Sequence, residues 1–150
     1  SFASFANAEI DEVIGKGIDQ AEHRKIDIFS SIVLYNNGNN SFTMNKLPAE
    51  CQLSVINDII VEDINDDGRK DLITAGNRFN VEVETTPSDA SLGALLINNG
   101  DRIWKTTSAG ESGIYLNGDI KDLLYIENHL ISSENNGPVR ILKKADKLNN

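Results

Sequence analysis

Short runs of β-branched and aliphatic residues, separated by turn residues, make up most of the chain after residue 25. Runs of this length between clusters of Asn, Gly and Asp are typical of β-strands. The pattern predicts an antiparallel all-β fold with a short N-terminal helical segment. Strands are expected in KIDIFSSIVLY (25–35), SVINDIIVED (54–63), DLITAG (71–76), FNVEVETT (79–86), GALLIN (93–98), RIWKTT (102–107), GIYLNGDIKDLLYI (113–126) and VRILKK (139–144).

The segment 7–24 differs, because its apolar residues recur at the spacing of one helix face. Asn7 is the expected N-cap of this helix. Gly15 and Gly17 weaken its middle, so two short helices are the alternative. The apolar positions are Ile10, Val13, Ile14, Ile18 and Ala21.

Four Asn-Gly pairs interrupt the strand-like runs. This dipeptide favours tight β-hairpins, because both residues accept the positive φ of a type I′ turn. Hairpins are therefore expected at Asn37-Gly38, Asn99-Gly100, Asn117-Gly118 and Asn136-Gly137.

The chain also contains an internal repeat. VLYNNGNNSFTM (33–44) aligns with LLINNGDRIWKT (95–106) at an offset of 62, which is 95 minus 33. A fainter match places DLITAGN (71–77) against HLISSEN (129–135), at an offset of 58. The second offset is shorter by four residues, a change that falls inside the acidic segment described below.

A period of about 60 residues, with a few strands in each unit, is typical of the blades of a β-propeller. We expect a helical lead-in over residues 1–25 and two antiparallel blade-like units, 26–88 and 89–150, the second ending in a C-terminal strand. Propellers close with about 4 to 8 blades, so two units leave open edges. The expected partners are therefore the remaining blades of a longer chain or further copies of this one.

The segment VEDINDDGRKDL (61–72) crowds five acidic residues around one glycine. Its form, D-x-[DN]-x-D-G-x-x-D-L, places oxygen ligands at the spacing of a calcium loop, with Gly68 at the sharp turn and Asp66 pointing away. Thr74 stands where an EF-hand has its closing Glu, and a strand-like run follows, so the loop is expected between two strands. The expected ligands are Asp63, Asn65, Asp67, the carbonyl of Arg69, and Asp71 directly or through water.

A solvated acidic turn, stabilised by hydrogen bonds from Asp and Asn side chains, is the alternative for this segment. If a metal binds, three carboxylates favour Ca²⁺ over Zn²⁺, which prefers His or Cys, and Mg²⁺ is the weaker competitor. The equivalent place in the second unit, YIENHLI (125–131), has no Asp-rich loop, so one calcium site is expected.

The loop, its trailing Leu72 and the aliphatic run before it resemble the FG-GAP and VCBS repeats of β-propellers, as in the integrin α-subunit head. Nearly the whole chain resembles the C-terminal end of bacterial VCBS-repeat proteins that often carry an ASPIC/UnbV module. The segments that carry this resemblance include LYNNGNNSFTMNKLPAECQLS, VEDINDDGRKDLITAGNRFNVEVE and NNGPVRILK. The resemblance implies a calcium-binding propeller in an exported protein, located outside the cell, at its surface or in the periplasm.

Composition excludes some classes of partner. The formal net charge of -9 leaves no excess of Lys and Arg for nucleic acid or an anionic membrane. No run of about 18 apolar residues is present, so membrane insertion is not expected. The single cysteine, Cys51, is expected to be a small buried side chain.

No catalytic constellation is visible, so the chain is not expected to be an enzyme by itself. His23 is placed on the polar side of the helix and His129 at a strand start, both structural or solvated. Glu82 and Glu84 are expected on a solvated strand face. Trp104 and Phe42 occupy equivalent repeat positions and are expected in an inter-sheet core, with a sugar-stacking platform as the alternative.

The sequence therefore favours a binding or scaffold module, with a protein or carbohydrate ligand and a mainly structural calcium ion. Two alternatives stay open. One is an accessory part of a polysaccharide-degrading enzyme, and the other is a calcium-dependent adhesion module.

Overall fold

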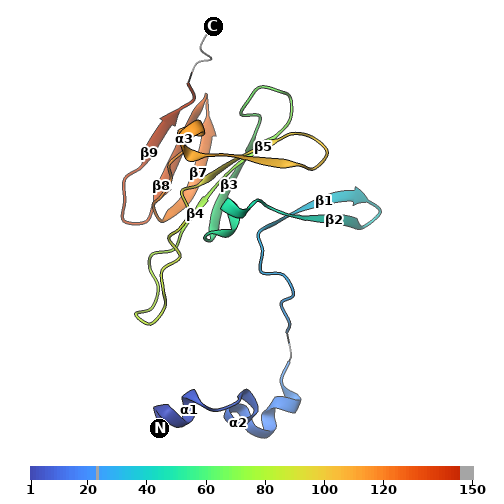
Figure 1. Cartoon of the computed structure of the whole chain (residues 1–150), viewed down its shortest axis with the longest axis vertical. Coiled ribbons are helices and arrows are strands. Elements are labelled where there is room, and N and C mark those ends of the chain that lie inside the picture. Colours follow the sequence, from blue (N-terminus) through green and yellow to red (C-terminus); the bar gives the residue numbers. More distant parts are fainter. Residues whose placement is uncertain (23, 146–150) are drawn as a thin grey trace.

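Three antiparallel sheets make up the body of the molecule (Figure 1). The structure is a computed structural model that describes residues 1–22 and 24–145. The predicted all-β architecture is confirmed, and none of the sheets in this part of the chain closes on itself. The strands are β1 (Ile32–Gly38) and β2 (Ser41–Lys46) in the first sheet, β3 (Ile56–Glu62), β4 (Asp71–Gly76), β5 (Ala94–Asn98) and β6 (Trp104–Thr107) in the second, and β7 (Ile120–Ile126), β8 (His129–Glu134) and β9 (Arg140–Lys143) in the third.

The N-terminal helices lie apart from the sheets, at the far end of an extended segment (Figure 1). They are α1 (Phe2–Ala6), α2 (Ile10–Ile14) and the 3₁₀ helix η1 (Gly15–Gln20). A single helix over 7–24 is therefore wrong, and the alternative of two short helices in this segment is confirmed by α2 and η1. Asn7 ends α1, and Glu9 caps α2 through a capping box with Glu12. Gly15 ends α2 with φ of 64°, a conformation that glycine adopts readily. No helix of the described chain is long and apolar enough to cross a membrane.

The first repeat is confirmed as a pair of hairpins in the same register. Asn36 pairs with Phe42 between β1 and β2, and Asn98 pairs with Trp104 between β5 and β6, at the predicted offset of 62. The residues at the tip of each turn follow the glycine and have positive φ, at Asn39-Asn40 and Asp101-Arg102. The first two predicted Asn-Gly hairpins are therefore present.

The second repeat is confirmed in the hairpins β3–β4 and β7–β8, which share a register shift at the same place. The shift lies between Ile56 and Asp58 in one hairpin and between Ile120 and Asp122 in the other, an offset of 64. The return strands differ by 58, so the connection shortens by six residues (64 minus 58), not by four. The eight-residue acidic loop 63–70 is replaced by the two-residue turn Glu127-Asn128.

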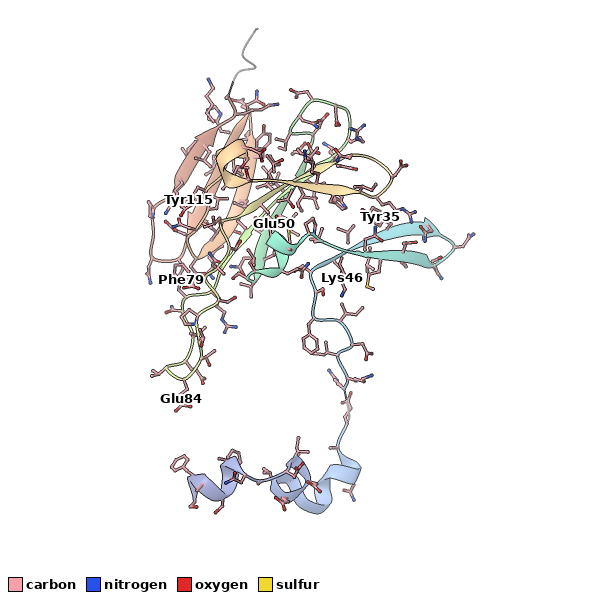
Figure 2. All side chains as sticks on the ribbon, viewed as in Figure 1. Tyr35, Lys46, Glu50, Phe79, Glu84 and Tyr115 are labelled. Atoms are coloured by element: carbon pink, nitrogen blue, oxygen red, sulfur yellow. The ribbon has the colours of Figure 1, made fainter. Side chains whose placement is uncertain are left out.

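Several expected elements are absent from the described structure. FNVEVETT is not a strand: it lies in the long loop 77–93, where Arg78 and Ser88 form an isolated bridge and Val83 is fully exposed. Figure 2 shows Glu84 at the tip of this loop, so Glu82 and Glu84 do not share a strand face. Strand pairing begins only at Ile32 in the run 25–35.

Asn117-Gly118 does not form the expected hairpin, because no strand precedes it to pair with β7. Its two carbonyl oxygens instead accept hydrogen bonds from the buried side chain of Asn77. Asn136-Gly137 joins β8 to β9 as expected. A short helix not foreseen, α3 (Ala109–Ser112), begins with a capping box between Ser108 and Glu111.

The boundaries of the sheets do not coincide with the boundaries of the predicted repeat units. The sheet β3–β6 continues across the boundary between residues 88 and 89, so each unit contributes strands to two sheets. The division into domains stays a prediction.

Two hydrophobic clusters cover the two faces of the sheet β3–β6. Ile73, Ala75 and Leu95 meet residues of the third sheet on one face. On the other face, residues of β4 and β5 meet the first sheet and the 3₁₀ helix η2 (Ala49–Gln52). The members of the first cluster are Ile73, Ala75, Leu95, Ile114, Leu116, Ile120, Leu123 and Leu130, and those of the second are Leu47, Cys51, Leu72, Ala94 and Leu96.

The aromatic residues at equivalent repeat positions have different surroundings. Trp104 packs against the second cluster and donates a hydrogen bond from Nε1 to Tyr35 Oη at 2.6 Å, as an inter-sheet residue should. Phe42 is 58% exposed, so its assignment to the core is wrong. Cys51 is buried, as predicted, and burial raises the pKa of its thiol.

The repeat provides a matched pair for testing this packing. Leu96 is fully buried, whereas its repeat equivalent Leu34 is 57% exposed. Leu96→Ala is expected to lower the free energy of unfolding by about 2–5 kcal/mol, and Leu34→Ala by less than about 0.5 kcal/mol. Urea denaturation followed by circular dichroism measures both, and equal losses would contradict the assigned core.

Candidate metal centre

The acidic loop 63–70 joins β3 to β4 and is held by hydrogen bonds to its own backbone. Asp63 accepts hydrogen bonds from the amides of Asp67 (Oδ1, 3.0 Å) and Gly68 (Oδ2, 2.8 Å). Asp66 and Gly68 have φ of 63° and 85°, so the chain turns sharply twice within three residues. Gly68 takes this conformation at no steric cost, which is the role predicted for it.

Asn65 and Asp67 complete the inner part of the loop. Asn65 Oδ1 accepts from the same Asp67 amide at 3.1 Å, and Asn65 Nδ2 donates to Asp67 Oδ2 at 2.9 Å. Asp67 Oδ1 accepts from the amide of Arg69 at 2.9 Å. The side chains of Asp63, Asn65 and Asp67 are therefore brought together, as their spacing predicts.

Asp71 anchors the loop to the sheet through both of its carboxylate oxygens. It is fully buried at the first position of β4. Its Oδ2 accepts from the amide of Ile64 and its Oδ1 from the amide of Asn98, each at 2.9 Å. The carboxylate thus joins the start of the loop to the end of β5, a structural role that the spacing alone did not reveal. Its role as a ligand stays a prediction.

Basic side chains compensate the crowded negative charge. Arg69 Nη2 lies 2.6 Å from Asp67 Oδ2, and Lys70 Nζ lies 2.8 Å from Glu62 Oε2. Lys144 Nζ lies 3.0 Å from Asp66 Oδ2, so the Asp66 carboxylate is directed towards the residue that follows β9. The hydrogen bond with Asp66 raises the pKa of Lys144. The Arg69 side chain therefore forms an ion pair with Asp67. A role for the Arg69 carbonyl as a metal ligand stays a prediction.

The donor set of the loop fits a hard cation. Each carboxylate oxygen has two lone pairs, so one that accepts a single amide N–H keeps one for a metal ion. One side-chain oxygen each of Asp63 and Asn65 accepts a hydrogen bond from the amide of Asp67. The expected ligands are all oxygen atoms, with no sulfur or imidazole among them, and Ca²⁺ prefers such ligands. The proposed ligand set combines carboxylates with the amide oxygen of Asn65. Within residues 1–22 and 24–145, no three His, Cys, Asp or Glu side chains are clustered as a metal site.

The sequence analysis also singled out two histidines outside the acidic loop. His129 begins β8, as predicted, and its Nδ1 is 2.8 Å from the carbonyl of Glu127. His23 and the side chain of Ile18 lie outside the described part of the chain. Asp119 was not anticipated: burial raises its pKa, but hydrogen bonds from Lys121 and Asn135 outweigh this effect, and the net shift is downward.

Comparison of the chain with protein-family models, with curated proteins and with solved structures gives no match in any of the three. The resemblance to FG-GAP and VCBS repeats stays an expectation that the motif residues carry.

The pKa of Asp67 predicts a pH dependence of stability. The amide of Arg69 and then the side chain of Asn65 stabilise the ionised carboxylate, so its pKa lies below the ordinary value. The resulting stability is fully present above about pH 4, the ordinary pKa of Asp, and is lost as the pH falls through the lowered value. In EDTA, Asp67→Asn should melt below wild type at pH 7, and this difference should vanish at low pH. Asp89→Asn, at an exposed position in the loop 77–93, controls for net charge. A difference independent of pH would contradict the account.

The anchoring role of Asp71 is tested by removing its carboxylate. Asp71→Ala leaves the amides of Ile64 and Asn98 without their acceptor, which should cost about 1–3 kcal/mol for each amide that water cannot reach. Asp89→Ala removes an exposed carboxylate and should change the free energy of unfolding by less than about 0.5 kcal/mol. Denaturant titration in EDTA measures the free energy of unfolding of both variants. Similar losses in Asp71→Ala and Asp89→Ala would contradict the anchoring role of Asp71.

Proposed function

We propose that this chain is a calcium-binding part of a β-propeller of the FG-GAP and VCBS type. It would serve an exported bacterial protein as a binding or scaffold module. Two features support the propeller. The hairpins repeat in register along the chain, and the sheet β3–β6 is a four-stranded antiparallel meander with another sheet packed on each face. Four-stranded sheets arranged one after another in this way are the units of propellers.

The proposal for calcium rests on one observation, the meeting of Asp63 and Asn65 side-chain oxygens at the amide of Asp67. Asp63, Asn65 and Asp67 would hold the ion. Bound there, Ca²⁺ would neutralise the repulsion between the carboxylates. Asp67 Oδ2 also accepts hydrogen bonds from Asn65 and Arg69, so an ion bound to this oxygen would displace one of these donors.

A structural role for the ion follows from what the loop connects. The loop leaves β3, enters β4 and is tied to β5 through Asp71, Asn98 and the bond from Arg69 Nε to the Asn98 carbonyl at 2.7 Å. An ion that fixes the loop therefore fixes the same end of three neighbouring strands. In an extracellular module, a dissociation constant of about 10⁻⁴ to 10⁻³ M would suffice.

The second unit supports a single site. The hairpin β7–β8 turns through Glu127-Asn128 alone, and both residues have positive φ, as in a type I′ turn. A turn of two residues has no room for ligands at three alternate positions. One Ca²⁺ per chain is the stoichiometry that the proposal requires.

Calcium should stabilise the folded chain. At a free concentration ten times the dissociation constant, binding contributes about 1.4 kcal/mol, which raises the melting temperature by about 3–6 °C in a chain of this size. Asp67→Ala should abolish this rise, and Asp89→Ala, outside the loop, should retain it. Differential scanning calorimetry in Ca²⁺ and in EDTA measures the effect.

Two outcomes would contradict the proposal. Identical melting curves in Ca²⁺ and in EDTA would leave the loop as a hydrogen-bonded acidic turn. A rise that survives in Asp67→Ala would place the ion elsewhere in the chain.

A further inference from the structure

A polar cavity of about 400 Å³ lies where the loop 77–93 leaves β4 and meets the third sheet. Figure 2 shows Phe79 at the base of this loop. The volume falls within the range of about 300–1,000 Å³ that is typical of small-molecule sites. The cavity is lined by Phe79 and Asn80 from the loop, by Asp119 just before β7, and by residues 134–138 at the end of β8 and in the turn to β9.

Hydrogen bonds between the sheets fix the walls of this cavity. Asn77, buried at the start of the loop, donates from Nδ2 to the carbonyl of Gly118 at 3.2 Å. The amide of Phe79 donates to the Asp119 carboxylate, and the amide of Asn135 donates to the Asp119 carbonyl at 2.9 Å. The start of the loop, the segment before β7 and the end of β8 are therefore joined at one place.

The Glu134 side chain is held in a space that two glycines leave open. It is only 8% exposed. Gly118 and Gly137 do not have positive φ, so backbone conformation does not explain why glycine stands there. A Cβ atom at either position would overlap the Glu134 side chain. The two glycines thus let the backbone approach this carboxylate closely.

The charges at the cavity are balanced. Lys121 Nζ lies 2.5 Å from Asp119 Oδ1, and Arg140 Nη2 lies 3.2 Å from Glu134 Oε1. Each carboxylate is therefore paired with one cationic side chain. A metal ion or an amine would meet these two cations, and an anion would meet the two carboxylates. The cavity favours a neutral polar ligand.

Three kinds of group are available to such a ligand. Within the described chain, Glu134 Oε2 has no hydrogen-bond partner, and neither do the side-chain amides of Asn80 and Asn136. In the same part of the chain, Ser132 Oγ is the only fully buried side-chain polar atom without a partner, so Glu134 Oε2 is accessible from the cavity. Phe79, which is 45% exposed, adds an aromatic surface.

We propose that this cavity binds a neutral saccharide unit. A sugar hydroxyl donates to Glu134 Oε2, and an ionised acceptor makes a stronger hydrogen bond than a neutral one. Other hydroxyls accept from the Asn80 and Asn136 amides, while the apolar C–H face of the sugar ring packs on Phe79. The inference rests on the binding role proposed above but not on calcium, because the cavity shares no residue with the loop 63–70.

Amide-resolved NMR of the whole chain in EDTA tests the proposal. The probes are the methyl glycosides of glucose, galactose, mannose, fucose, rhamnose and xylose, each added up to about 50 mM, which saturates a site with a dissociation constant of about 1 mM. At least one probe should shift the side-chain amides of Asn80, Asn135 and Asn136 and the backbone amide of Gly137. These resonances should follow one saturating curve.

Variants of the cavity should weaken this binding. Glu134→Gln should do so by at least about tenfold, because Arg140 keeps the amide oxygen and the amide nitrogen cannot accept from a hydroxyl. Phe79→Ala should weaken it by about two- to tenfold, and it keeps the test decisive if Glu134→Gln does not fold. Glu84→Gln, at the loop tip, and Phe42→Ala, at an exposed aromatic residue on β2, are the matched controls and should bind as wild type does.

Three results would overturn the proposal. The first is the absence of a saturable shift at the cavity with every probe. The second is binding that neither Glu134→Gln nor Phe79→Ala weakens, or that Phe42→Ala weakens as much. The third is a shift of the cavity resonances by Ca²⁺ alone, which would make this a cation site. None of these results alters the expected effect of Ca²⁺ on the melting temperature, so the two proposals fail separately.

Discussion

Strand β4 is buried on both of its faces, and the positions of the other elements follow from this. All six of its residues are buried, with Ile73 and Ala75 facing the third sheet and Leu72 facing the first. An antiparallel strand with two apolar faces is stable only when a layer covers each of them. The three sheets are therefore one packed unit, and the connections into and out of β4 are fixed in space.

The acidic loop depends on this strand through Asp71. A buried carboxylate is costly unless hydrogen bonds satisfy it, and here amides from the loop and from β5 do so. The closing of the loop is thus coupled to the packing of β4 and β5. The inner residues Asp63 and Asn65 are held by local hydrogen bonds at the surface, where a cation can reach them. A rigid sheet below and an exposed loop above is the usual arrangement for a site that binds an ion reversibly.

The parts of the structure that could be predicted are those determined by residues close together in the sequence. The hairpins were predicted because turn residues and alternating apolar residues act within a few positions of each other. The convergence of Asp63, Asn65 and Asp67 was predicted for the same reason. The segment FNVEVETT was predicted to be a strand but is a loop, because alternation alone cannot show that a neighbouring strand is present to pair with it. The unpaired position of Asn117-Gly118 and the buried contacts of Asp71 likewise depend on residues distant in the sequence, such as Asn77 and Asn98.

Amide-resolved NMR during a Ca²⁺ titration tests most directly the proposal that the loop 63–70 holds a calcium ion. The amides of Asp67, Gly68 and Arg69 donate to the proposed side-chain ligands, so their resonances should shift together and saturate at one ion per chain. The resonances of the turn Glu127-Asn128 should stay in place. Shifts spread over exposed acidic residues without saturation, or no shift in the loop, would contradict the account.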